Sequence, residues 1–213
     1  MAESRAGARR KTRAGTPVRE TGYPGKIRII AGRWRGRRLE VPLAPGLRPT
    51  PDRVRETLFN WLAPHIEGAR CLDLFAGTGA LCLEALSRGA GEVIMVEQAP
   101  HAAQALRENL DRLGAVNAEV VNRDAVEYLR QPPAPFDIIF IDPPFQSDLI
   151  AVCAALIEER GWLKPGGLIY IEAPSGPKPL PIPNAWELVR SKTAGQVGYH
   201  LLCRAPTGAA SRP

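Results

Sequence analysis

The sequence has no long apolar run. Its 213 residues are 45% hydrophobic, yet no stretch approaches the roughly 18 consecutive apolar residues that a membrane-spanning helix needs. The first residues are basic, but the apolar segment that defines a secretory signal peptide does not follow them. We therefore predict a cytoplasmic protein without a membrane partner, built as one domain with a sizeable core and a small appendage.

Cysteine and histidine are also scarce, and neither is spaced to bind a metal. The cysteines lie far apart in apolar surroundings and form no CxxC pair: Cys71, Cys82, Cys153 and Cys203. A chain without an export signal is not expected to carry a structural disulfide, and metal-ligand spacing is missing. We predict no metal site and interpret the cysteines as small buried residues.

Acidic residues are few at the N-terminal end. Residues 1–40 hold 12 Arg and Lys against 3 Asp and Glu, a net charge of +9, whereas residues 41–213 hold 16 against 19, a net charge of −3. Residues 1–26 have almost no large apolar side chains, and we predict a disordered leader there and a disordered tail at 206–213. The leader fits two roles equally, a solubilising segment or an arm that binds nucleic acid.

Residues 27–41 predict a β-hairpin with a cationic tip. Two short apolar runs flank a basic turn bounded by glycine, which is typical of a hairpin. The residues at the tip that are candidates for binding nucleic acid are Arg33, Trp34, Arg35, Arg37 and Arg38. Arginine contacts phosphates and tryptophan stacks on bases, so this mixture favours RNA. The alternative is a hairpin that is merely solvated.

A helix is predicted to begin at Thr50. Thr50 offers an N-cap hydroxyl, and Pro51 suits the first helical position. Apolar residues then recur at helical spacing until Pro64 ends the helix. The opposite side is charged and includes Arg53 and Arg55.

From residue 69 onward, short apolar strands alternate with helices. Strands are expected at 70–75, 92–97, 118–122, 136–141 and 167–172, and helices near 79–88, 100–113, 124–130 and 147–160. This alternation predicts an α/β fold with a doubly wound, Rossmann-like parallel sheet. Two further runs, at 186–193 and 197–204, flank a glycine-containing turn. They predict a C-terminal antiparallel hairpin.

The strongest local signal is the glycine turn after the first of these strands, which reads Leu-Asp-Leu-Phe-Ala-Gly-Thr-Gly-Ala-Leu over 72–81. Gly77 and Gly79 let the backbone approach a ligand at the carboxyl edge of the sheet. A dinucleotide fingerprint would need a third glycine where Cys82 stands. Asp73 would repel a pyrophosphate but attract an ammonium group. S-adenosylmethionine (SAM) carries such a group and has no phosphate.

Two more acids follow the next strands. Glu97 ends the second strand, near the spacing at which an acid accepts hydrogen bonds from ribose hydroxyls. Asp124 follows the third strand, where it could accept from an adenine amino group while the backbone of Ala125 contacts the ring. Alternatively, Asp124 is simply the N-cap of the next helix. Acids at three consecutive strand ends favour a cofactor site.

The fourth strand leads directly into Asp142-Pro143-Pro144-Phe145. Both prolines lack an amide hydrogen, so the segment presents acceptors to an exocyclic amine. Phe145 could stack on an extruded base. Because a sulfonium is already an activated leaving group, positioning and electrostatics suffice for methyl transfer.

These motifs resemble class I SAM-dependent methyltransferases that modify amino groups. The segment 48–60, Arg-Pro-Thr-Pro-Asp-Arg-Val-Arg-Glu-Thr-Leu-Phe-Asn, together with 27–39, resembles the RsmD family of 16S rRNA guanine-N2 methyltransferases. The resemblance runs from about residue 26 to residue 204.

The resemblance implies roles for particular residues and a division of the chain. Cofactor binding is implied for Asp73, Phe75, Ala76, Gly77, Gly79, Glu97, Asp124 and Ala125, and binding of the target guanine for Asp142, Pro143, Pro144 and Phe145. The helix with Arg53 and Arg55 would close over the site, and both arginines are implied to bind nucleic acid, with one of them pairing with a carboxylate or a phosphate. Residues 27–66 would form this lid and 67–205 the SAM-binding domain, in a monomer that acts on small-subunit rRNA or the ribosomal subunit.

Two other functions remain open. The Asp-Pro-Pro-Phe motif also fits a DNA adenine-N6 methyltransferase, although a separate target-recognition domain is missing. A non-catalytic RNA-binding assembly factor is a second alternative, which the intact motifs disfavour.

Overall fold

The computed structural model describes residues 25–41, 50–144, 148–176 and 179–206. The predicted leader apart from Gly25 and Lys26, the predicted tail apart from Pro206, and Phe145 lie outside the described residues.

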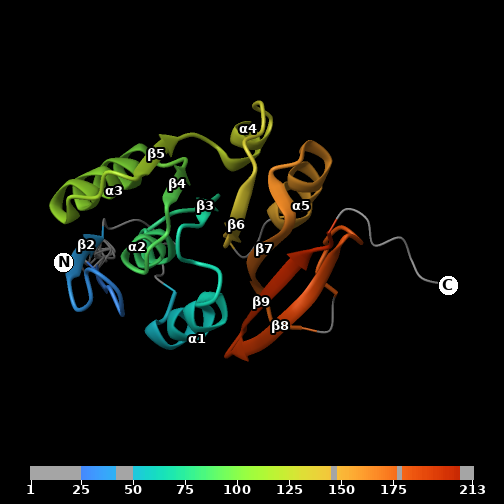
Figure 1. The fold of residues 1–213 in the computed structure, drawn as a ribbon, viewed down its shortest axis with the longest axis horizontal. Helices are drawn as coiled ribbons and strands as arrows, with labels where there is room; N and C mark the ends of the chain where they lie inside the picture. Colours follow the sequence, from blue (N-terminus) through green and yellow to red (C-terminus); the bar gives the residue numbers. More distant parts are fainter. Residues whose placement is uncertain (1–24, 42–49, 145–147, 177–178, 207–213) are drawn as a thin grey trace, which may run out of the picture.

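A seven-stranded sheet forms the centre of the molecule, and its strand order is β5-β4-β3-β6-β7-β9-β8 (Figure 1). Its strands are β3 (Arg70–Asp73), β4 (Glu92–Glu97), β5 (Ala118–Asn122), β6 (Phe136–Ile141), β7 (Leu163–Pro174), β8 (Trp186–Ala194) and β9 (Val197–Arg204). The strands β3 to β7 are parallel, whereas β9 is antiparallel to both β7 and β8. The predicted Rossmann-like fold and its C-terminal hairpin are confirmed.

Five helices are described: α1 (Asp52–Leu62), α2 (Ala80–Ser87), α3 (Pro100–Leu113), α4 (Ala125–Leu129) and α5 (Leu149–Arg160). One apolar cluster joins a face of the sheet to α1, α2 and α3, for example through Leu58, Leu83 and Leu106. The cluster on the other face includes Leu129 of α4 and Ile157 of α5. Helices therefore cover both faces of the sheet, as a doubly wound fold requires. No helix in the described part of the chain is long and apolar enough to cross a membrane.

The short strands are apolar because they are buried on both faces. β6 lies between β3 and β7, and five of its six residues are buried. Phe140 packs in the cluster with α1 to α3, and Ile139 and Ile141 pack in the cluster with α4 and α5. A strand covered on both faces needs apolar residues at consecutive positions instead of strict alternation.

The predicted N-terminal hairpin is present as the antiparallel pair β1 (Gly25–Arg28) and β2 (Arg38–Val41). It is fastened to α2. The buried carboxylate of Glu84 accepts hydrogen bonds from the backbone N–H groups of Ile30 (2.8 Å) and Ala31 (3.1 Å). The carbonyl of Ser87 accepts from the N–H of Arg33 (2.7 Å). The tip of the hairpin is thereby held against the helix that follows the glycine turn.

This attachment requires glycine at position 32. Gly32 has φ = 78°, and a Cβ built there would lie 1.8 Å from the carbonyl oxygen of Ser87. Any side chain would push the hairpin away from α2, because this neighbour is backbone and cannot rotate aside.

The starts of the first helix and of the last parallel strand differ from the prediction. Helix α1 begins at Asp52 with Pro51 as its N-cap residue and without a side-chain cap, so Thr50 is not the N-cap. The side chain of Thr50 is buried and hydrogen-bonds to Glu172 of β7 instead, because a tertiary acceptor is available to it. β7 begins at Leu163 and not at 167, since Leu163 already pairs with Phe136 of β6.

Candidate active site

The carboxyl ends of the parallel strands bring the predicted acids to one edge of the sheet. Asp73 ends β3, Glu97 ends β4, Asp124 follows β5, and Asp142 follows β6. Parallel strands have all their carboxyl ends at the same edge (Figure 1), which is where open α/β sheets bind ligands. Glu172, near the end of β7, joins them and was not predicted.

Glu97 ties the glycine turn to the end of β4. One carboxylate oxygen accepts from the N–H of Gly77 (2.9 Å), and the other accepts from the N–H of Ala99 (2.7 Å). Gly79 has φ = 78°, and a Cβ there would lie 2.6 Å from Leu106. Each carboxylate oxygen has two lone pairs, so Glu97 can hold the turn and still accept from a further hydroxyl.

Asp73 supports the same turn from the interior. Its side chain is buried, and it accepts hydrogen bonds from the N–H of Phe75 (3.1 Å) and from the thiol of Cys82 (2.8 Å). Burial raises the pKa of Asp73 to about 6. Direct pairing with an ammonium group, which we expected from the sequence, does not fit this enclosed position. Cys82 is buried as predicted, but it also donates a hydrogen bond within the site.

Asp124 takes the simpler of its two predicted roles. Its Oδ1 accepts from the N–H groups of Val126 (2.8 Å) and Glu127 (3.1 Å), and it is the N-cap residue of α4. This hydrogen bonding leaves Oδ2 to contact a ligand. The neighbouring Ala125 is buried.

The segment after β6 runs from the interior to the surface: Asp142 is half-buried, Pro143 is buried, and Pro144 is exposed. Burial raises the pKa of Asp142 well above its ordinary value, and the charges of Glu172 and Asp73 raise it further. A carboxyl group in such surroundings binds a proton more readily than an exposed one does.

Glu172 is the site residue that sequence reasoning missed. Its side chain is 5% exposed, and it accepts a hydrogen bond from the hydroxyl of Tyr170 (2.7 Å). Because Ile171 pairs with Ile141, Glu172 lies beside Asp142 on the neighbouring strand. The sequence did contain a signal for Glu172, because it is an acid near the end of the fifth parallel strand, as the predicted acids are at the ends of the first four.

The residues predicted to bind nucleic acid fall into two groups. Five are exposed, on the hairpin and on α1: Arg33, Arg35, Arg37, Arg38 and Arg53. Two others point inward. Trp34 is 6% exposed and packs in the core, so its predicted stacking on RNA does not fit the structure. Arg55 is 2% exposed and pairs with Asp52 (2.6 Å) and Glu84 (3.8 Å), which makes it a structural residue and not a phosphate contact.

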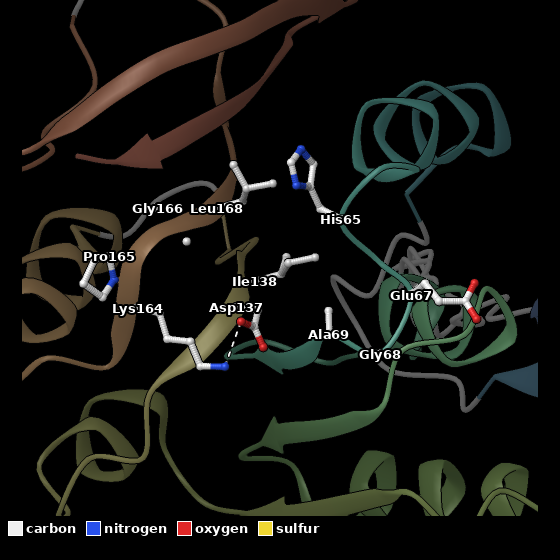
Figure 2. Close-up of a pocket in the computed structure, with 11 residues that line it drawn as sticks. His65, Glu67, Gly68, Ala69, Asp137, Ile138, Lys164, Pro165, Gly166 and Leu168 are labelled. Atoms are coloured by element: carbon white, nitrogen blue, oxygen red, sulfur yellow. Dashed lines mark hydrogen bonds and ion pairs between the residues drawn. The ribbon is translucent and has the colours of Figure 1, made fainter. Parts of the chain in front are cut away.

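A separate hollow of about 420 Å³ lies at the opposite edge of the sheet (Figure 2). It is lined by residues at the amino ends of β3, β6 and β7, and an ion pair between Lys164 and Asp137 (2.8 Å) lies on its wall. None of the predicted site residues lines it. In the described part of the chain, no group of three or more His, Cys, Asp or Glu residues could hold a metal ion.

Comparison with known proteins identifies the family to which the chain belongs. Residues 27–203 match the family described as Conserved hypothetical protein 95. The chain is 52% identical over 184 residues to ribosomal RNA small subunit methyltransferase D of Escherichia coli, covering 86% of this chain and 93% of that protein. The chain belongs to the RsmD family of methyltransferases. The Haemophilus influenzae family member is 48% identical, over 83% of this chain and 93% of its own length.

Solved structures share the fold of this family. The yhhF protein of Escherichia coli aligns with a TM-score of 0.81 at 51% identity, covering 86% of this chain and all of that one. A more distant structure, the Thermus thermophilus 16S rRNA N2 methyltransferase RsmC in complex with AdoMet and guanosine, aligns with a TM-score of 0.61 at 25% identity. The alignment covers 85% of this chain and 50% of the RsmC chain.

Proposed function

We propose that this protein transfers the methyl group of SAM to the exocyclic N2 amine of a guanine in small-subunit rRNA. One observation carries the proposal: the Asp142-Pro143 acceptor segment and the turn tied to Glu97 lie at the same edge of the sheet. The names of the relatives support a small-subunit rRNA substrate. The distant structure with AdoMet and guanosine supports this cofactor and this base.

The residues at the glycine turn fit SAM. Glu97 would accept from the ribose hydroxyls, and the glycines would let the backbone of the turn approach the methionine part. Oδ2 of Asp124 would accept from the adenine amino group, with Ala125 against the ring. Asp73 would act indirectly, because its hydrogen bonds to Phe75 and Cys82 hold the turn in place. Bound SAM supplies an activated methyl group.

The acceptors after β6 would orient the target amine. An amine next to an aromatic ring has two N–H donors and a delocalised lone pair. Hydrogen bonds from these donors to the Asp142 carboxylate and to a proline carbonyl would direct the lone pair toward the methyl group. Bound SAM would supply the methyl group, so that the N–C bond would form as the S–C bond breaks, and Asp142 or solvent would take one N2 proton. Phe145 would stack on the base.

The exposed arginines would bind the RNA backbone. Arg33, Arg35, Arg37, Arg38 and Arg53 are all solvent-accessible, and the hydrogen bonds to Glu84 and Ser87 hold the hairpin tip against α2. The phosphate contacts would therefore be made at a fixed position relative to the glycine turn.

Two variants separate cofactor binding from methyl transfer. Asp142→Ala is expected to bind SAM and RNA normally and to lose most single-turnover methyl transfer, because the orienting acceptor is gone. Glu97→Ala is expected to weaken SAM binding by about 1.5–3 kcal/mol, the range for hydrogen bonds to charged groups. Calorimetry with SAM and transfer of labelled methyl groups measure the two effects.

The control variant is Asp111→Ala, which removes an exposed acid on α3 and should change neither property. The substrates are small-subunit rRNA, assembled small subunits and duplex DNA. Methylation of DNA adenine with no methylation of rRNA would favour the adenine-N6 alternative, and full activity in Asp142→Ala would rule out the assigned role of that residue.

A further inference from the structure

Glu172, on β7, and Asp142, directly after β6, face the same side of the sheet. Phe140 and Tyr170 lie two residues before them, pair with each other across β6 and β7, and pack in the same apolar cluster. Side chains two residues apart on a strand point the same way. Paired strands lie about 4.8 Å apart, so the two carboxylates stand side by side over the face that carries α1.

Glu172 is buried without a cation to neutralise it. In the described ranges no ion pair involves this residue. Its partners are two hydroxyl donors, from Tyr170 (2.7 Å) and Thr50. An ionised carboxylate has about four lone-pair positions, so two neutral donors leave acceptor capacity for further N–H groups.

The Watson–Crick edges of guanine and adenine differ in the group beside the amine. Guanine has an N1–H donor next to its N2 amine, whereas adenine has an N1 lone pair next to its N6 amine. The Asp-Pro-Pro segment recognises an amine and therefore fits both bases. A second carboxylate beside it attracts the guanine edge and repels the adenine edge.

We propose that Glu172 is the residue that selects guanine, an inference that rests on the proposed function. Glu172 would accept a hydrogen bond from guanine N1–H while Asp142 holds the N2 amine. The hydroxyls of Tyr170 and Thr50 fix the orientation of this carboxylate. Thr50 lies just before α1. Its hydrogen bond to Glu172 therefore connects the residue that selects the base to the helix that bears Arg53.

The test compares guanine with 2-aminopurine at the target position of a small-subunit rRNA fragment. 2-Aminopurine keeps the amine but lacks N1–H. The wild-type protein is expected to prefer guanine about 10- to 100-fold in kcat/KM, the range for one hydrogen bond to a charged group. Glu172→Gln should reduce this preference to about 3-fold or less, because an amide presents both a weaker acceptor and a donor.

Two control variants distinguish recognition from structural support. Tyr170→Phe removes one of the two hydroxyls that orient the carboxylate but keeps the carboxylate itself, so the preference for guanine should fall less than it does in Glu172→Gln. Glu187→Gln changes an exposed acid on β8 and should match the wild type. If Glu172 were only structural, Glu172→Gln would slow methylation of both bases by the same factor.

The outcomes also separate this inference from the proposed function. A wild-type protein that methylates no guanine in rRNA would contradict the proposed function. A wild-type protein that methylates guanine, while Glu172→Gln keeps the full preference over 2-aminopurine, would overturn the role of Glu172 alone.

Discussion

The acidic side chains at the carboxyl edge of the sheet have two different roles. Glu97 and Asp124 each satisfy backbone N–H groups and still have acceptor capacity. Asp73 is enclosed and serves the turn alone. The difference follows from the surroundings of Asp73, which is buried with one oxygen facing the N–H of Phe75 and the other facing the thiol of Cys82.

Asp73 should make the stability of the cofactor-free protein depend on pH. Its pKa in the folded protein is about 6, above the ordinary value of 3.8, so the folded state binds this proton more tightly than the unfolded state does. Its contribution is therefore present at low pH and is lost as the pH rises through about 6. A shift of about two units corresponds to about 3 kcal/mol.

Asp73→Asn should remove this contribution. Compared with the wild type, the free energy of unfolding of the variant should fall less between about pH 4 and pH 7. Denaturant titrations at several pH values measure this slope. Asp111→Asn is the exposed control, and a variant slope equal to that of the wild type would show that Asp73 is not the titrating group.

Among the elements, the N-terminal hairpin combines an outer and an inner surface. Its arginines Arg33, Arg35, Arg37 and Arg38 are exposed, whereas Trp34 between them packs into the core. The bonds from Glu84 and Ser87 fix which side faces inward. Substitutions on the two surfaces should therefore have different consequences.

Trp34→Ala should lower the free energy of unfolding by about 3–5 kcal/mol, the usual loss for a buried tryptophan or phenylalanine. Replacing the four arginines with alanine should leave stability and SAM affinity unchanged. RNA affinity should fall, and its salt slope should decrease by about 0.7–0.9 for each lost phosphate contact. Thermal melts and RNA titrations over a salt series measure both effects. An unchanged salt slope in the four-arginine variant would mean that this surface is only solvated.

Over the whole molecule, positive charge is concentrated in the N-terminal residues. The effect of where these charges lie on RNA binding can be tested separately from the effect of how many there are. Residues 1–22 hold 6 Arg and Lys against 2 Glu, a net charge of +4. Removing them changes the net charge as much as the four-arginine variant does. We expect the deletion to reduce RNA affinity less, because the hairpin arginines are held at a fixed position against α2 and residues 1–22 have no aromatic side chain.

Binding assays at one salt concentration, with both proteins side by side, decide this prediction. Equal losses would indicate that long-range attraction by net charge controls binding, and that the position of the hairpin contributes nothing further.

Sequence alone determined the order of the elements, the sheet class and the grouping of the candidate acids at one edge of the sheet. Hydrophobic periodicity and glycine placement are local signals, and parallel strands necessarily gather their carboxyl ends at one edge, so Glu97, Asp124 and Asp142 could be grouped in advance. Only the tertiary structure decided which way Trp34 and Arg55 point, and that Glu172 stands beside Asp142. Those outcomes depend on partners distant in sequence, such as Glu84 and Thr50, because burial is decided by what packs against a side chain and not by its type.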